Sequence, residues 1–242
     1  MFAKSLPNLF TIGNLALGII SIIFVFNGEV EFAAIMVIVA MLLDGLDGRV
    51  ARALNVTSEF GKELDSLSDI ISFGVAPAFV VYAAAFQDMN SAAAWTATAI
   101  FPICGALRLA RYNVSDCSPG HFVGLPIPAA GGVLATMALF HQELTPSVLL
   151  IGELLLAFLM VSTVKYPKIK RFRMSRTTIW ITPIIVAIAV FLAILFPGIL
   201  SKLLFVPLVL YTLLGLKKKV RRLSRKRKQR ETDEQSEVSD TL

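Results

Sequence analysis

One polar stretch organises this sequence: Asp44-Gly-Leu-Asp47-Gly48-Arg-Val-Ala51-Arg52, followed by Gly61, Asp65 and Asp69. If the stretch forms two helices, Asp44, Asp47, Gly48 and Ala51 lie within an arc of about 100° on the first helix, with Arg52 at the edge of that arc. On the second helix, Gly61, Asp65 and Asp69 recur at every fourth position and so share one face. Each helix can therefore turn its carboxylates toward the other. The sequence predicts one shared site, formed by Asp44, Asp47, Asp65 and Asp69.

The rest of the chain is apolar enough to lie in a lipid bilayer. Of its 242 residues, 56% are hydrophobic, and the mean hydropathy is +0.73, whereas soluble globular chains contain about 45–50% apolar residues. We therefore predict an all-α integral membrane protein, a bundle of about eight transmembrane helices. The predicted spans cover about residues 9–26, 32–52, 63–86, 92–111, 128–140, 147–164, 178–196 and 200–216. In the third span, Pro77 predicts a kink or the end of the first half of the helix.

This pattern divides the chain into two parts of unequal length. Residues 1–216 form a transmembrane catalytic domain with the polar motif at 44–69, and residues 217–242 form a tail that is first basic and then acidic. A basic stretch directly after a membrane helix attracts anionic lipid headgroups, so we expect membrane lipids rather than nucleic acid as its partner. The last dozen residues have nothing to pack against and are expected to be disordered.

The charges of the loops predict the orientation in the membrane. An even number of spans places both termini on one side, and the basic loops lie on that side, while the opposite loops carry acidic residues. The positive-inside rule then places both termini and the aspartates on the cytosolic side of the cell membrane.

Four acids at one depth of a membrane require a cation. An acidic side chain deep in a bilayer costs about 2.5–3.5 kcal/mol on insertion scales, and acids of like sign also repel one another. Oxygen ligands without a nearby thiolate or histidine select a hard divalent cation, Mg²⁺, Mn²⁺ or Ca²⁺, over zinc. Two such ions bridged by carboxylates would form a clamp for phosphoryl chemistry.

The spacing of these residues resembles a known signature. The pattern D-x2-D-G-x2-A-R-x8-G-x3-D-x3-D of the CDP-alcohol phosphatidyltransferase family is met at every specified position from Asp44 to Asp69. Residues 55–67, the run Ser72-Phe-Gly-Val-Ala-Pro77 and the run Arg108-Leu-Ala-Arg111-Tyr-Asn113 are similar to the phosphatidylserine synthase branch of that family.

The resemblance implies a reaction. The donor would be CDP-diacylglycerol, the acceptor L-serine and the products phosphatidylserine and CMP, and the protein would be a homodimer. The same reaction with glycerol 3-phosphate or inositol phosphate stays open, because phosphates on those acceptors would also bind arginine side chains. A divalent-cation transporter also needs intramembrane carboxylates, but its site should lie at the bilayer midplane, whereas these acids are expected at one interface.

The resemblance also assigns roles to the residues of the motif. It makes Asp69 the general base that takes the proton of the serine hydroxyl, although a carboxylate beside cations is a weak base and would act mainly through its position. Two ions, Mg²⁺ or Mn²⁺, would be held by Asp44, Asp47, Asp65 and Asp69. The CDP group would be bound by Gly48, Ala51, Arg52 and Gly61.

Two pairs of polar residues outside the motif each have two interpretations. Thr11 and Asn14, one turn apart on the first span, either hydrogen-bond to a neighbouring helix or help to bind the nucleotide, as the resemblance implies. Arg108 and Arg111, three residues apart, either reach the membrane interface or bind the carboxylate or phosphate of the acceptor. We expect the second role for the arginines.

Four further features carry expectations of their own. The run Gly124-Leu-Pro-Ile-Pro128 and the glycines after it either support close helix packing or cover the alcohol pocket. His121 and His141 are isolated, and we expect neither to be catalytic. Glu153 lies inside a membrane span, toward the side away from the aspartates, where we expect it to contact another helix or subunit.

Overall fold

The computed structural model of this chain describes residues 2–54, 58–114 and 121–167, with side chains at residues 7–45, 58–114 and 123–164. The predicted seventh and eighth spans and the tail at 217–242 lie outside the described residues. The count of eight spans and the division into a domain at 1–216 and a tail therefore stay predictions. The six earlier spans can each be compared with a helix.

Each of these six spans is found as a helix or a helical run. In chain order the elements are α1 (Phe2–Phe26), α2 (Val30–Leu54), a helical run from Glu59 to Phe86, α5 (Ser91–Val114), β1 (His121–Val123), α6 (Ile127–Leu139), α7 (Pro146–Val161) and β2 (Lys165–Pro167). The helical run begins earlier than predicted because Ser58 caps it. The Ser58 side chain accepts a hydrogen bond from the Gly61 N–H at 3.0 Å, which satisfies a backbone donor of the first turn.

The run from Glu59 to Phe86 changes its helical type. Its segments are α3 (Glu59–Asp69), η1 (Ile70–Val75), α4 (Ala76–Val81) and η2 (Tyr82–Phe86), where η marks a π-helix. The Ala76 N–H donates to the Ile71 carbonyl, five residues back, which is the π-helical pattern. Pro77, which has no N–H to donate, follows directly. The interruption expected near Pro77 is therefore a π-helical segment and not the end of the helix. Asp69 is the last α-helical residue before this segment.

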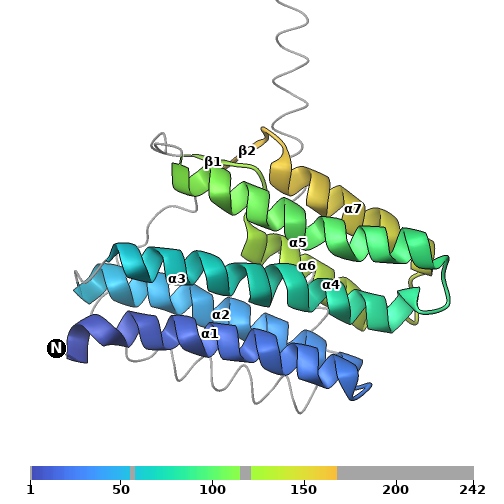
Figure 1. Cartoon of the computed structure of the whole chain (residues 1–242), viewed down its shortest axis with the longest axis horizontal. Coiled ribbons are helices and arrows are strands. Elements are labelled where there is room, and N and C mark those ends of the chain that lie inside the picture. Colours follow the sequence, from blue (N-terminus) through green and yellow to red (C-terminus); the bar gives the residue numbers. More distant parts are fainter. Residues whose placement is uncertain (1, 55–57, 115–120, 168–242) are drawn as a thin grey trace, which may run out of the picture.

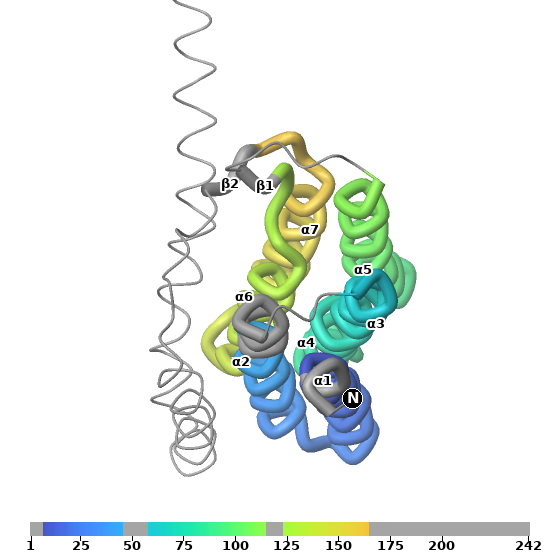
Figure 2. Tube along the Cα trace, turned by 90° about the vertical axis from the view of Figure 1, so that its left-hand side faces the viewer, coloured from blue at the N-terminus to red at the C-terminus, as the bar shows by residue number. Residues whose placement is uncertain are grey.

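The helices form a bundle around an apolar core. In Figure 1 the long helices lie side by side, and in the end-on view of Figure 2 they follow the circuit α1, α2, α6, α7, α5 and the α3–η2 run. Neighbours in this circuit are in contact, and α4 also packs against α6. The side chains buried between the helices include Val37, Phe73, Phe101, Leu134 and Met160. One end of the bundle gathers the start of α1, the end of α2, the start of α3 and the end of α5 (Figure 1).

The length and apolar composition of several described helices are those of membrane-spanning segments. Three are long and apolar enough to cross a membrane, Pro7–Phe26, Glu59–Phe86 and Ser91–Val114, and two shorter helices, Ile127–Leu139 and Pro146–Val161, are also apolar. Large apolar side chains such as Ile23, Ile103 and Phe158 are exposed on the outside of the bundle, where lipid would cover them. The protein is membrane-embedded and, apart from one short strand pair, all-α in the described residues.

That strand pair and one glycine shape the connections. β1 and β2 pair antiparallel, with Phe122 opposite Tyr166, where the sequence suggested only a loop and a connector. A side chain at Gly131 would meet the backbone of Phe73, so α6 can approach η1 this closely only with glycine there. Of the two interpretations of this segment, the contact at Gly131 supports close helix packing.

Candidate functional site

Three helices bring charged side chains to one end of the bundle. Asp44 comes from α2, Asp65 and Asp69 from successive turns of α3, and Arg108 from the last part of α5. α2 continues to Leu54, about 15 Å beyond Asp44 at 1.5 Å per residue. Asp44 therefore lies nearly three helical turns inside the end of α2.

The carboxylates converge as the spacing predicts. One oxygen each of Asp44, Asp65 and Asp69 lies within 4.8 Å of the others. Asp69 is 7% exposed, and the other two are half-buried. The side chains of Asp44 and Asp69 are close enough to interact directly. The fourth predicted ligand, Asp47, lies on α2, but its side chain falls outside the described residues.

The three carboxylates fit a hard divalent cation. Oδ1 of Asp65 and Oδ1 of Asp69 are buried, and neither has a hydrogen-bond partner in the described part of the chain. Three acids at this range repel one another, and oxygen-only ligands are those that Mg²⁺ and Mn²⁺ prefer. A cation among them would use the unsatisfied oxygens and offset the repulsion.

The α1 side of the site consists of Thr11 and Asn14, both buried. The Thr11 hydroxyl donates to the Pro7 carbonyl of its own helix at 3.1 Å. The amide of Asn14 is fully buried, and neither its nitrogen nor its oxygen has a hydrogen-bond partner in the described residues. Because an unmade hydrogen bond on a buried polar group is costly, the Asn14 side chain is suited to a ligand.

Hydrogen bonds between α1 and the α3–η2 run do exist, but they use the backbone of α1. Ser68 Oγ donates to the Thr11 carbonyl at 3.2 Å, and Ser72 Oγ donates to the Asn14 carbonyl at 2.9 Å. Both serines are fully buried, and Ser68 directly precedes Asp69. The sequence alone did not assign these serines a contact with α1, although their spacing of four residues within one predicted span is a visible signal.

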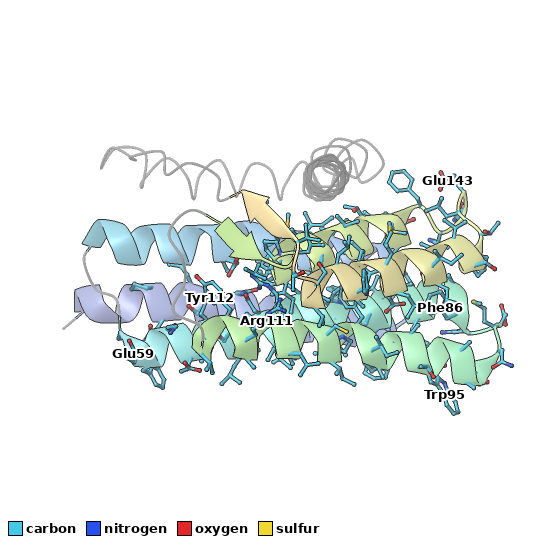
Figure 3. All side chains as sticks on the ribbon, turned by 90° about the horizontal axis from the view of Figure 1, so that it is seen from above. Glu59, Phe86, Trp95, Arg111, Tyr112 and Glu143 are labelled. Atoms are coloured by element: carbon cyan, nitrogen blue, oxygen red, sulfur yellow. The ribbon has the colours of Figure 1, made fainter. Side chains whose placement is uncertain are left out.

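The two arginines of α5 have different surroundings. Arg108 is 6% exposed, its guanidinium lies 5.8 Å from the centre of the Tyr112 ring, and it interacts electrostatically with Asp69. Arg111 turns away toward α7, where its guanidinium donates to backbone carbonyls. Figure 3 shows Arg111 and Tyr112 on this part of α5, with Glu59 at the near end of the bundle and Phe86, Trp95 and Glu143 at the far end. Only Arg108 faces the aspartates.

The other predicted CDP-site residues are placed by their helices. Gly48, Ala51 and Arg52 lie on α2, which runs through them without a break, but their side chains are outside the described residues. Gly61 lies in the first turn of α3, where an added side chain would approach the Asn8 and Ser58 side chains at 3.0 Å. Gly61 therefore permits the start of α3 to lie against α1, whether or not it also contacts a ligand.

The sequence of the whole bundle can be compared with known proteins. A family model described as CDP-alcohol phosphatidyltransferase matches residues 4–166, which include the three converging aspartates and the end of α5. The chain belongs to the CDP-alcohol phosphatidyltransferase family.

Curated members of this family resemble the chain over most of its length. A protein of Helicobacter pylori (strain ATCC 700392 / 26695) named CDP-diacylglycerol–serine O-phosphatidyltransferase is 37% identical over 198 residues, covering 78% of this chain and 81% of the relative. A protein of the same name from Bacillus subtilis (strain 168) is 36% identical, covering 69% and 92%. An archaetidylserine synthase of Methanothermobacter thermautotrophicus is 38% identical, covering 68% and 70%.

Three other predicted features of this member of the CDP-alcohol phosphatidyltransferase family lie on β1, just after α6 and on α7. His141 Nδ1 lies 2.9 Å from the Ala138 carbonyl, at the C-terminal end of α6. His121 lies in β1, and its side chain is outside the described residues. Glu153 is fully buried in α7, and neither carboxylate oxygen has a hydrogen-bond partner in the described part of the chain.

Proposed function

We propose that this protein transfers a phosphatidyl group from CDP-diacylglycerol to the hydroxyl of L-serine, giving phosphatidylserine and CMP. The observation that carries the proposal is the convergence of three carboxylates from α2 and α3 at one end of a membrane-embedded bundle. The family assignment supplies the class of donor. The names of the relatives share serine as the acceptor and differ in the lipid, phosphatidyl or archaetidyl, which supports serine here.

The acidic cluster would bind the metal ions that this reaction needs. Asp44, Asp65 and Asp69 are assigned as ligands, and Asp47 completes a set of four that suffices for two ions, Mg²⁺ or Mn²⁺. The bound ions supply neutralising charge for the pyrophosphate of the donor and for the departing CMP. A site at one end of the bundle suits a substrate whose acyl chains stay in the bilayer while its headgroup reaches water.

The α1 and α2 faces would hold the nucleotide. The Asn14 side chain has a buried amide whose nitrogen and oxygen both lack hydrogen-bond partners in the described residues. Thr11 lies one turn away on the same helix. Gly48, Ala51, Arg52 and Gly61 are assigned to the same CDP site on the family motif. Arg52 would contribute a positive charge toward the phosphates.

Asp69 would take the proton of the serine hydroxyl. It lies deepest in the cluster and directly before the π-helical segment, and the neighbouring Ser68 and Ser72 bond to α1. These contacts fix its backbone between α1 and the other acids. For a general base, a fixed position within hydrogen-bond reach of the hydroxyl matters more than basicity in water.

Arg108 would bind the carboxylate of L-serine. Its guanidinium is buried, packs against the Tyr112 ring and lies near Asp69. A carboxylate bound there would place the serine hydroxyl on the side of the general base. Because a phosphate would also suit a guanidinium, this contact favours an anionic acceptor and does not by itself select serine.

The active site is assigned to the cytosolic side of the cell membrane. The connections at the opposite end of the bundle, residues 27–29, 87–90 and 140–145, contain Glu29, Asp88 and Glu143 and neither lysine nor arginine, which agrees with the positive-inside rule. We also assign a homodimer, on the resemblance to the family. Thiol labelling of single-cysteine variants in intact cells and light scattering of the purified protein test these two assignments.

Release of CMP from purified protein tests the proposed reaction. The assay supplies CDP-diacylglycerol with Mg²⁺ or Mn²⁺ and compares L-serine with glycerol 3-phosphate and inositol phosphate. We expect release with serine alone, its loss on chelation and its recovery when metal is restored. Release with another acceptor would overturn the serine assignment and keep the family chemistry.

A transporter is separated from a transferase by nucleotide binding. CMP should raise the melting temperature of the transferase in the presence of metal, whereas a cation transporter has no reason to bind it. Folded protein that neither binds CMP nor releases it from CDP-diacylglycerol would overturn the proposed reaction.

A further inference from the structure

We propose that Arg111 and Asn113 are positioning residues for Arg108: they fix the end of α5 from two sides and thereby set the affinity for the acceptor. The inference rests on the proposed function, in which Arg108 binds the serine carboxylate. It also revises the expectation that Arg111 itself binds the acceptor, because the Arg111 guanidinium is used elsewhere in the structure.

The first attachment joins α5 to the end of α7. Arg111 Nη1 donates to the Val161 carbonyl at 2.8 Å, and Nη2 lies 3.4 Å from each of the carbonyls of Met160 and Ser162. Val161 is the last residue of α7. Carbonyls at the end of a helix lack donors within the helix and carry its negative dipole end. The planar, positively charged guanidinium of Arg111 therefore binds the C-terminal end of α7, where free carbonyl groups and the helix dipole favour a cation.

The turn after β1 completes the same attachment. Arg111 Nη2 also lies 3.4 Å from the Val123 carbonyl. The next residue, Gly124, has φ +82°, and a side chain there would meet the Met160 carbonyl and Arg111 Nη2. Its N–H donates to the Val164 carbonyl at 2.8 Å. The backbone of the turn after β1 thus packs closely against the guanidinium. Position 124 requires glycine, both because φ is positive there and because a side chain would collide with Met160 and Arg111.

The second attachment joins α5 to α3. Asn113 Nδ2 donates to Ser66 Oγ at 3.1 Å, and that hydroxyl in turn donates to the Lys62 carbonyl at 3.1 Å. Ser66 directly follows Asp65, one of the three converging acids. The hydroxyl can accept from Asn113 while it donates along its own helix. The end of α5 is therefore tied to the helix that carries two of the aspartates.

Arg108 lies between these attachments and the aspartates. It is one turn before Arg111 on α5, and its guanidinium interacts with Asp69 while it packs against Tyr112. A shift of α5 would move this guanidinium relative to Asp69, which binds the other end of the acceptor. Since a misplacement of about 1 Å can cost a reaction about 10²-fold, the attachments of α5 have a kinetic effect beyond stability.

The experiment measures CMP release by the purified protein. L-serine is varied at saturating CDP-diacylglycerol, and CDP-diacylglycerol is varied at saturating L-serine. Arg111→Lys keeps the charge but replaces a planar fork by a point donor. We expect its KM for serine to rise at least about fivefold, with the KM for CDP-diacylglycerol within about twofold of wild type. Thr98→Ala is the matched control, since Thr98 lies on α5 but bonds only to its own helix, at the Ala94 carbonyl.

A double-mutant cycle tests the second attachment independently. If Asn113 acts through Ser66, then Asn113→Ala and Ser66→Ala raise the KM for serine equally, and the double variant adds nothing further. CMP-dependent thermal stabilisation confirms that each variant is folded. Additive effects, with the larger effect in Asn113→Ala, would mean that Asn113 contacts the substrate and would overturn the proposal for that residue.

The two levels of inference fail in different ways. Wild-type protein that does not turn over serine overturns the proposed function. Wild-type protein that does, together with an Arg111→Lys variant whose KM for serine is unchanged, overturns the positioning role and leaves Arg111 as a cap of α7. Equal increases in the KM for both substrates would likewise assign Arg111 to general stability.

Discussion

Asp69 and Glu153 are both buried acids on helices of this bundle, and they lie in contrasting surroundings. Asp69 is 7% exposed and has Asp44, Asp65 and Arg108 around it. Glu153 is 0% exposed, and its carboxylate has no hydrogen-bond partner in the described residues. Burial of an acid in a membrane helix is thus common to both. What separates them is the number of charged groups that converge on the same point.

This difference matters because a metal site needs several ligands. A hard divalent cation is held by multiple oxygens, and the aspartate cluster offers three carboxylates from two helices, whereas Glu153 offers one. Like-charged acids placed together are also unfavourable without a cation, so such a cluster is hard to explain by packing. A single acid can be retained for a contact between helices or subunits. The comparison therefore predicts opposite outcomes for the same chemical change at the two positions.

The largest effect is expected for Asp69→Asn. The amide keeps the size of the side chain but cannot take a proton, and it is a poorer metal ligand, so kcat should fall on the order of 10³-fold. CMP release at saturating serine and CDP-diacylglycerol measures this loss. Glu153→Gln is the matched control, because it makes the same acid-to-amide change in a buried helix position. Turnover by Asp69→Asn within about tenfold of wild type would remove Asp69 from the role of general base.

An intermediate effect is expected for Asn14→Leu. Leucine has a similar size but no polar atoms, so a nucleotide bound to the Asn14 amide should lose about tenfold in affinity, seen in the KM for CDP-diacylglycerol and in CMP binding. The KM for serine should be unchanged. Thr136→Val is a suitable control, since Thr136 is buried but bonds to carbonyls of its own helix. A rise in the KM for serine alone would place Asn14 on the acceptor side.

The smallest effect is expected for Glu153→Gln. Turnover should stay within about twofold of wild type, and the melting temperature should be unchanged or higher, since a neutral amide is easier to bury than an acid that has no partner in the described residues. Activity and thermal unfolding are measured on the same preparation, and light scattering follows the oligomeric state. A tenfold loss of activity, or dissociation of a dimer, would show that Glu153 has a partner in another part of the chain or in a second copy.

The parts of the molecule that were predictable are those with a local signal. The spans from α1 to α7 follow from apolar length, and the meeting of Asp44 with Asp65 and Asp69 follows from helical spacing on two consecutive helices. The π-helical segment after Asp69 was not predictable, because Pro77 indicates an interruption but not its form. The pairing of β1 with β2 was missed as well, since these strands are only three residues long and lie far apart in the sequence.

The roles of Arg108 and Arg111 show the same limit at the level of single residues. Three residues apart on one helix, they have the same chemistry and the same expected role. In the bundle, α5 lies between the α3–η2 run and α7, so Arg108 faces the aspartates while Arg111 binds the end of α7. The hydrogen bond from Asn113 to Ser66 is likewise a contact between helices that no spacing within α5 predicts.

Apolar length and helical periodicity are properties of each segment alone, so they were sufficient to predict a helical membrane protein with an acidic cluster between two consecutive helices. Residues at fixed spacing likewise indicated the family. The packed bundle was needed to show which arginine faces the acids, which buried amide has no partner among the described residues, and which serines hold α1 against the helix that carries Asp69. Those features depend on how helices distant in the chain pack together, and such packing is set by the whole bundle rather than by any one segment.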